Sequence, residues 1–109
     1  MTVIILPKVR QYFYELSYIL YEKDYFSFLE TSEQYVEELI CDIQKNLPVK
    51  QHKPAPKHFD KYGKGMKYAS FRKNKQTTWY VFFKTYKKNR ETFYVVRYIA
   101  NNHVIAQYL

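Results

Sequence analysis

The chain of 109 residues has little of what disulfide-rich proteins and metalloproteins are built from, with one cysteine and three histidines. As the single cysteine, Cys41 excludes an internal disulfide, and its position on an apolar helical face predicts a buried structural thiol. His52 and His58 lie in a proline-rich stretch, but the histidines and the cysteine do not match zinc-site spacings. We therefore expect no metal and no cofactor.

Long apolar runs are also missing. No stretch approaches the roughly 18 apolar residues that a bilayer-spanning helix needs. The opening MTVIILPKVR has neither a basic n-region nor a small-residue cleavage site. These absences predict a cytoplasmic protein that does not enter a membrane. The length and the 47% hydrophobic content predict one compact domain over residues 1–109.

Acidic residues are scarce in the second half of the chain. Residues 1–44 hold three Lys/Arg and eight Asp/Glu, whereas residues 45–109 hold fifteen Lys/Arg and two Asp/Glu. The local balances are −5 and +13, within a net charge of +8. Such a basic half is typical of a protein that binds a polyanion through counterion release, or an acidic protein partner. A basic surface that is only solvated is the simpler alternative.

Hydrophobic periodicity predicts a short strand and two helices in the first half of the chain. The run VIIL at residues 3–6 favours a strand. Apolar residues then recur at spacings of three and four over residues 8–23 and again over residues 32–47, which predicts two amphipathic helices. Thr31 and Ser32 are the expected N-cap residues of the second helix. Joined by a short turn, the two helices should form an antiparallel hairpin.

The second half of the chain predicts a loop and three strands. Residues 48–66 hold three of the four prolines and both glycines, show no periodicity and are expected to form a loop. The period then changes to two over residues 67–73, 77–86 and 92–100, which are rich in Thr, Val, Tyr, Phe and Trp. These runs should pair as an antiparallel meander.

The turns between these strands contain Asn74 and Asn89, which can occupy the left-handed positions that glycine would otherwise supply. The order of elements predicts an α+β fold, with a short N-terminal strand and a two-helix antiparallel hairpin packed on a small, mostly antiparallel sheet. The helices should cover one face of the sheet and leave the other face for water or a partner.

This order of elements resembles the RelE/ParE superfamily, the toxins of bacterial type II toxin–antitoxin systems. The resemblance is in the layout of the whole chain and in the local patterns SFRKNKQTTWYVFF and FYVVRYIANNHVIAQYL. It implies a small, mostly antiparallel sheet under a pair of N-terminal helices. Members of the superfamily include nucleases that cut mRNA on the ribosome and relatives that inhibit DNA gyrase. Both kinds are held inactive by an antitoxin peptide that wraps around them.

Similarity to the nuclease members implies cationic residues before and on the middle strand, a basic residue beyond the last strand and a tyrosine near the end. Arg72, His103 and Tyr108 stand at matching places, and Arg97 is a further cation on the last strand. Histidine can transfer a proton near neutral pH, and arginine can stabilise a phosphate as charge builds on it. Where cleaving members commonly have an arginine, this chain has Trp79, which can stack on a base but cannot neutralise a phosphate.

Phosphate contacts need charge and little geometry, so lysines near the first strand of the meander are the expected nucleic-acid-binding residues. The leading hypothesis is a toxin that cleaves mRNA on the ribosome and is neutralised by a cognate antitoxin peptide. A non-catalytic inhibitor of DNA gyrase and a basic RNA-binding module are the alternatives, so enzymatic activity and oligomeric state stay open. The expected nucleic-acid-binding residues are Lys57, Lys61, Lys64, Lys67, Lys73 and Lys75.

Overall fold

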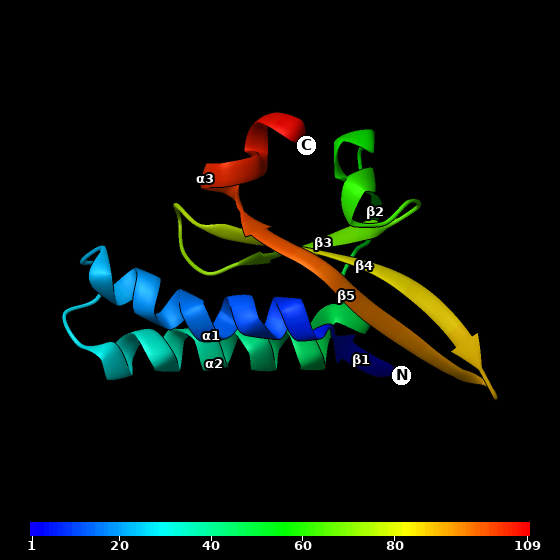
Figure 1. Ribbon diagram of the computed structural model, residues 1–109. Helices are drawn as coiled ribbons and strands as arrows, with labels where there is room; N and C mark the ends of the chain where they lie inside the picture. Colours follow the sequence, from blue (N-terminus) through cyan, green and yellow to red (C-terminus); the bar gives the residue numbers. More distant parts are fainter.

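A five-stranded mixed sheet with the strand order β1-β5-β4-β3-β2 organises the computed structural model, which describes residues 1–109 (Figure 1). β1 is parallel to β5, and all other neighbouring strands are antiparallel. The predicted α+β class is confirmed, whereas the resemblance to RelE/ParE toxins stays a prediction. In chain order the elements are β1 (Thr2–Ile5), α1 (Pro7–Glu22), α2 (Leu29–Asn46), η1 (Leu47–Val49), β2 (Lys53–Pro54), η2 (Lys57–Tyr62), β3 (Lys67–Arg72), β4 (Thr78–Lys88), β5 (Glu91–Asn101), α3 (Asn102–Ile105) and η3 (Ala106–Tyr108).

The two long helices begin without side-chain caps. α1 has Pro7 in its first turn, where the missing N–H would have had no helical partner. α2 starts at Leu29 with Phe28 as its N-cap residue. The predicted caps are wrong, because Thr31 and Ser32 lie inside the helix and Ser32 is fully buried. Most helical stability in proteins comes from packing of an apolar face, and here packing extends the helix upstream of its predicted start.

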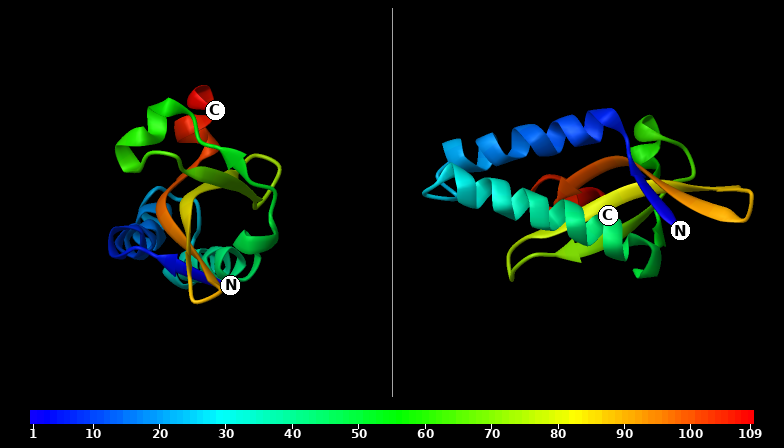
Figure 2. Two further views of the ribbon diagram at one scale, coloured as in Figure 1. Left: turned by 90° about the vertical axis from the view of Figure 1, so that its right-hand side faces the viewer. Right: turned by 90° about the horizontal axis from the view of Figure 1, so that it is seen from below.

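The α1–α2 hairpin covers one face of the sheet, as the views in Figure 1 and Figure 2 agree. A cluster of 16 buried residues fills the space between the hairpin and this face. The largest fully buried side chains of the cluster are Phe13, Leu39, Ile43, Leu47, Phe71, Trp79, Val81, Phe83 and Val96.

No helix of the structure combines the length and the apolar character that crossing a membrane requires.

Cys41 is exposed on α2, so the prediction of a buried structural thiol is wrong. The buried residues nearest to it on the helix are Leu39 and Ile43. Each is two residues away, which corresponds to about 200° around the helix axis. Cys41 therefore points away from the sheet that Leu39 and Ile43 contact.

The two turns of the meander are built differently. Asn89 and Arg90, between β4 and β5, have φ values of 51° and 66°. A two-residue hairpin loop of type I′ requires positive φ at both positions, so the prediction for Asn89 is confirmed. The prediction for Asn74 is wrong, since its φ is not positive. Its side-chain oxygen instead accepts hydrogen bonds from the backbone N–H groups of Gln76 and Thr77, at 2.8 and 2.9 Å.

The sheet face opposite α1 and α2, called the far face below, is partly covered. Residues 48–66 form η1, β2 and η2 rather than a structureless loop, and η2 lies over the far face together with α3 and η3 (Figure 1, Figure 2). The expectation that this face is left open is therefore wrong, because apolar side chains of the predicted loop and of the C-terminal tail pack on it. Together they form a second, smaller core of Phe59, Met66, Phe82, Ala100 and Ile105.

Candidate nucleic-acid interface

Aromatic rings from β3, β4 and β5 lie side by side on the far face. Tyr68 is paired with Phe82, and Phe82 with Tyr98, so these residues form a row across the strands. Tyr80 stands edge-on to Tyr68, with ring centroids 6.0 Å apart. Phe82 is fully buried, whereas the three tyrosines are half-buried. Half-buried tyrosines can offer part of a ring and a hydroxyl group to a ligand.

The segment η2 is held on this row by further ring contacts. Tyr62 stacks on Tyr98, with centroids 3.9 Å apart and planes 5° from parallel. Phe59 packs on Phe82 at 4.4 Å between centroids. Burial, followed by the hydrogen bond with Tyr62, raises the pKa of Tyr98 to about 12. The ring contacts of Tyr62 and Phe59 fix η2 at the border of the far face.

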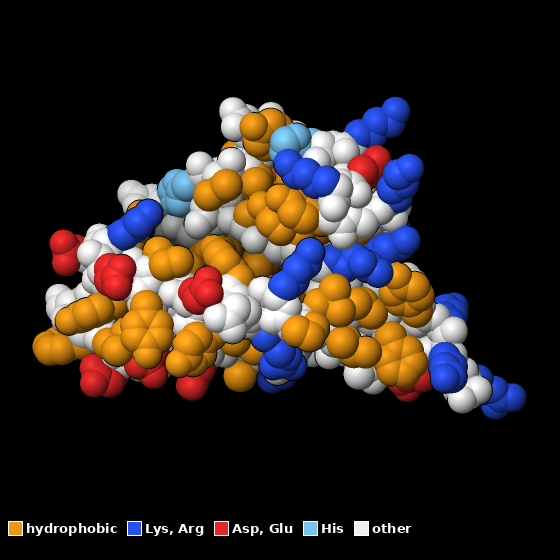
Figure 3. Space-filling model, in the orientation of Figure 1, with side chains coloured by type: hydrophobic (Ala, Val, Ile, Leu, Met, Phe, Trp, Pro, Cys, Tyr) orange, Lys and Arg blue, Asp and Glu red, His pale blue; other side chains and the backbone are white.

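Four of the predicted phosphate-binding lysines belong to η2, to the turn that follows it and to the start of β3. The single salt bridge of the structure joins the amino terminus at Met1 to Glu91, so these four lysines have no acidic partner. Figure 3 shows Lys and Arg side chains gathered over η2 and the strands, with Asp and Glu mostly over the helices. The four exposed side chains are Lys57, Lys61, Lys64 and Lys67.

Arg72 and His103 each contact the turn between β3 and β4, at different residues of the turn. Arg72 ends β3 and donates a hydrogen bond from Nε to the backbone oxygen of Asn74, at 3.2 Å. His103, in α3, has its Nε2 atom 3.3 Å from Oγ1 of Thr77 at the other end of the same turn. Both side chains are exposed. The fold thus brings a guanidinium and an imidazole to one short turn from distant parts of the sequence.

Asn102 fastens the C-terminal tail to this turn. Its side-chain oxygen accepts a hydrogen bond from the backbone N–H of Thr78 at 2.9 Å, and its amide nitrogen donates to the backbone oxygen of Gln76 at 3.1 Å. Asn101 is the N-cap residue of α3 and accepts from the backbone N–H of His103 at 2.9 Å. Neither asparagine was predicted to have a role, although the preference of asparagine for N-cap positions is a sequence signal for Asn101.

A cleft of about 500 Å³ lies beside His103. His103, Asn74 and Thr77 line one side of it, and rings from the helical hairpin, including Tyr25 and Tyr35, line the other. Polar groups and aromatic rings therefore face each other next to the turn that holds Arg72.

The neighbouring residues of the turn point to different sides. Lys75 is exposed, whereas the Nζ atom of Lys73 lies 5.3 Å from the ring centroid of Tyr35, on the helix side of the sheet. Trp79 is 1% exposed, and its indole N–H donates to the hydroxyl of Tyr35 at 3.0 Å. The stacking role considered for Trp79 is thus excluded, because both faces of its ring are enclosed in the main core.

Arg97 lies at a bulge and not in a regular strand position. The pairing of β4 with β5 shifts between Phe82 and Phe83, which leaves Arg97 without a partner between Val96 and Tyr98. The guanidinium donates to the hydroxyl of Tyr86 at 3.0 Å, and this bond lowers the pKa of Tyr86. Along β4 the bulge is five residues from Thr78 at the turn, roughly 16 Å. Arg97 therefore lies apart from Arg72 and His103.

Tyr108 is engaged by η2. Its ring stacks on the ring of His58, with centroids 3.6 Å apart and planes 3° from parallel. Phe59 contacts the same tyrosine edge-on. No local pattern in the sequence indicates this pair, because only the fold places the tail beside η2. The structure thus groups Arg72 with His103, and holds Tyr108 and Arg97 in other contacts.

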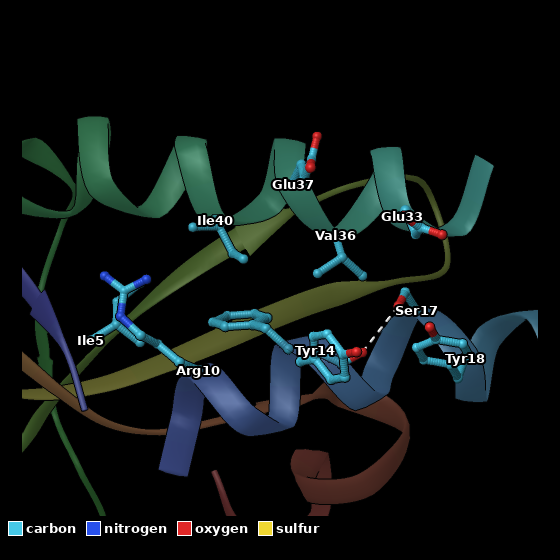
Figure 4. A pocket seen from close by; sticks show the side chains of 10 residues that line it. Ile5, Arg10, Tyr14, Ser17, Tyr18, Glu33, Val36, Glu37 and Ile40 are labelled. Atoms are coloured by element: carbon cyan, nitrogen blue, oxygen red, sulfur yellow. Dashed lines mark hydrogen bonds between the residues drawn. The ribbon is translucent and has the colours of Figure 1, made fainter. Parts of the chain in front are cut away.

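A further groove, of about 350 Å³, runs between α1 and α2 (Figure 4). Figure 4 shows Tyr14 and Tyr18 on one side and Glu33 and Glu37 on the other, with Arg10 at one end. None of the predicted site residues lines this groove. No group of three or more His, Cys, Asp or Glu side chains in the structure is placed to hold a metal ion.

No protein-family model matches this chain, and no curated protein or solved structure is significantly similar to it.

Proposed function

We propose that this protein is the toxin of a type II toxin–antitoxin system, which binds single-stranded RNA on its far face and cleaves mRNA on the ribosome. One observation carries the proposal: unpaired lysines of η2 and half-buried tyrosines of β3, β4 and β5 border the same face of the sheet. Lysines neutralise the phosphate backbone, and tyrosine rings stack on bases that are not paired. A double helix would keep its bases out of reach of such rings.

The turn between β3 and β4 is the proposed place of cleavage. Arg72 would stabilise the scissile phosphate while the 2′-oxygen attacks phosphorus and the bond to the 5′-oxygen of the next nucleotide breaks. His103 would transfer a proton, either from the 2′-hydroxyl or to the departing 5′-oxygen. The transfer that His103 does not perform would be made with water or a ribosomal group, so the proton lost by the 2′-hydroxyl is matched by the proton gained by the 5′-oxygen, and the products are a 2′,3′-cyclic phosphate and a free 5′-hydroxyl.

Dependence on the ribosome follows from what this turn lacks. Of the four predicted catalytic residues, Tyr108 is stacked on His58, and Arg97 donates a hydrogen bond to Tyr86. Arg72 and His103 then supply one cation and one proton-transfer group, where the reaction needs two proton transfers. We expect the isolated protein to bind RNA and to cleave it slowly, and the ribosome to supply the orientation and the remaining groups.

Inhibition of DNA gyrase without catalysis is the second candidate. The separation of Arg97 and Tyr108 from the turn favours it, because a binder needs a complementary surface but no set of acid and base groups. A basic RNA-binding module without a toxin role rests on the same lysines and tyrosines. In either toxin class, the expected neutralising partner is a cognate antitoxin peptide whose acidic residues would complement the +13 balance of residues 45–109.

Controlled expression separates these functions. If the protein cleaves mRNA, transcripts will be cut within codons during translation, and His103→Ala and Arg72→Ala will each reduce cutting by about 10²-fold. Gln107→Ala, an exposed change in the same tail, is the control and should keep full activity. Gyrase-dependent DNA breaks with intact transcripts would establish the second candidate. Unchanged growth with neither output would refute the toxin function and leave RNA binding by the purified chain to be measured on its own.

A further inference from the structure

We propose a second binding site, for a small aromatic carboxylate, in a pocket between α1, the end of β5 and the C-terminal tail. The pocket has a volume of about 360 Å³, which is within the range of small-molecule sites. It is lined by apolar side chains and by two cations, Lys8 and Arg97. This inference does not rest on the proposed action on RNA, since neither the η2 lysines nor the turn of Arg72 and His103 lines the pocket.

The hollow exists because β1 is shorter than β5. β1 pairs with β5 only as far as the pair Ile5 and Val96, and the chain then turns into α1 at Pro7. β5 continues to Asn101 without a neighbouring strand on that side. Val9 and Tyr12 of α1 and Val104 of the tail line the pocket beside this part of β5.

The positive charge of the pocket is not neutralised within the protein. Neither Lys8 nor Arg97 takes part in a salt bridge. Arg97 uses one hydrogen bond, to the hydroxyl of Tyr86, while its Nε atom is buried without a partner. Lys8 lies in the first turn of α1, which contains no acidic residue and has no side-chain cap. The positive end of the helix dipole adds to both cations, so the site favours an anion.

The shape and the walls of the pocket favour a flat, apolar body for that anion. The stacked pair of Tyr62 and Tyr98 forms one wall, and Tyr12 contributes a third ring. Flat rings pack well against such walls and bury much apolar area at low entropy cost. Gly63 lets Arg97 lie close, because a Cβ atom at this position would be 3.0 Å from Cδ of Arg97. The same chemistry is offered by a free aromatic acid and by the carboxyl terminus of a peptide that ends in an aromatic residue.

Calorimetric titration of the full chain with 1-naphthoate, and with neutral 1-naphthylmethanol as the matched probe, tests the site. We expect one molecule of naphthoate to bind per chain, and the alcohol to bind roughly tenfold more weakly, since the charged hydrogen bonds are lost. Lys8→Gln should reduce the affinity for naphthoate about tenfold and leave the alcohol unchanged. Val104→Trp, at an exposed position, should fill the pocket and abolish binding of both probes. Lys45→Gln, at an exposed position outside the pocket, should have no effect.

The outcomes are distinct. Equal affinity for acid and alcohol, an equal loss in Lys8→Gln and Lys45→Gln, or no binding of either probe would overturn the proposal. Arg97→Gln should reduce the affinity for naphthoate as Lys8→Gln does. Circular dichroism shows whether the Arg97→Gln variant is folded. If it is unfolded, the result for Lys8→Gln alone decides. Tighter binding of acetyl-Ala-Ala-Phe than of naphthoate, with loss on amidation of its carboxylate, would support the site and assign it to a peptide end. Tight binding of that amide would count against it.

Discussion

The two faces of the sheet are packed to different degrees. On the helix face, a cluster of 16 buried residues includes Trp79, Phe71 and Phe83, all at most 1% exposed. On the far face, a cluster of five buried residues is bordered by tyrosines that remain half-buried. Adjacent residues of one strand therefore serve different purposes. Trp79 stabilises the fold, and Tyr80, on the other side of β4, is available to a ligand.

The charge distribution follows the same division. The half of the chain that forms the helical hairpin has a balance of −5, and the half that forms η2 and most of the sheet has a balance of +13. Repulsion among so many unpaired lysines opposes folding, and a polyanion would relieve it. The helices that hold most of the acidic residues cover one face, and the exposed lysines of η2 border the far face, so under the proposed function a polyanion would bind there (Figure 3). Four predictions test this difference between the faces, and they are ordered by the size of the expected effect.

Trp79→Ala should lower the free energy of unfolding by about 3–5 kcal/mol, because it leaves a large cavity in the main core. Tyr80→Ala changes the next residue of β4, which lies on the far face, and should lower the free energy of unfolding by only about 1 kcal/mol. Urea unfolding followed by circular dichroism measures both. Comparable losses in the two variants would show that the faces do not differ in packing.

Replacing Lys57, Lys61 and Lys64 together by glutamine should weaken single-stranded RNA binding by about 10- to 100-fold, because three phosphate contacts are lost. The slope of log affinity against log salt should decrease by about 2. Fluorescence anisotropy with a labelled RNA at several salt concentrations gives both values. The control triple variant of Lys45, Lys87 and Lys88 removes the same charge at exposed positions away from η2. An equal effect in the control would mean that the affinity for RNA depends on net charge and not on the lysines beside the far face.

His58→Ala should destabilise the C-terminal tail by about 1 kcal/mol, because stacked ring pairs contribute energies of this order. Hydrogen exchange at the backbone amides of α3 and η3 should become faster, while exchange in α1 and α2 stays the same. His52→Ala is an informative contrast, since His52 packs edge-on to Phe83 on the helix side, at 4.7 Å between centroids. If His58→Ala slows or leaves unchanged the exchange of the tail, the stack does not hold it.

Tyr98→Phe should flatten part of the decline in stability at alkaline pH. Burial holds the pKa of Tyr98 at about 12 in the folded protein, against the ordinary value of 10.0. The folded state therefore keeps this proton when the unfolded state loses it, so the stabilising contribution is complete below pH 10 and is lost as the pH rises to 12. Melting temperatures between pH 8 and 12 measure the effect. Tyr25→Phe, at an exposed position, should follow the wild type, and an unchanged slope in Tyr98→Phe would contradict the prediction.

Local sequence patterns predicted much of the fold but less of the arrangement of the candidate site. The spacing of apolar residues indicates α1, α2 and the three long strands, because each pattern depends on residues close in the sequence. The same reasoning placed Cys41 on the buried side of α2. Cys41 is instead exposed, because a residue two positions from a buried one lies on the opposite side of a helix. This reasoning also placed Arg97 on the last strand, where the bulge opposite Phe82 and Phe83 leaves it without a pairing partner.

By itself, the sequence determined the order of the first strand, the two long helices and the three long strands, the excess of positive charge in the second half and the absence of an internal disulfide. These properties follow from composition and from contacts within a few residues. Only the tertiary structure decided that η2 and the tail cover part of the far face, that Arg72 and His103 share a turn, and that Tyr108 stacks on His58. Each of these arrangements joins residues far apart in the chain, and no local pattern specifies which distant surfaces meet.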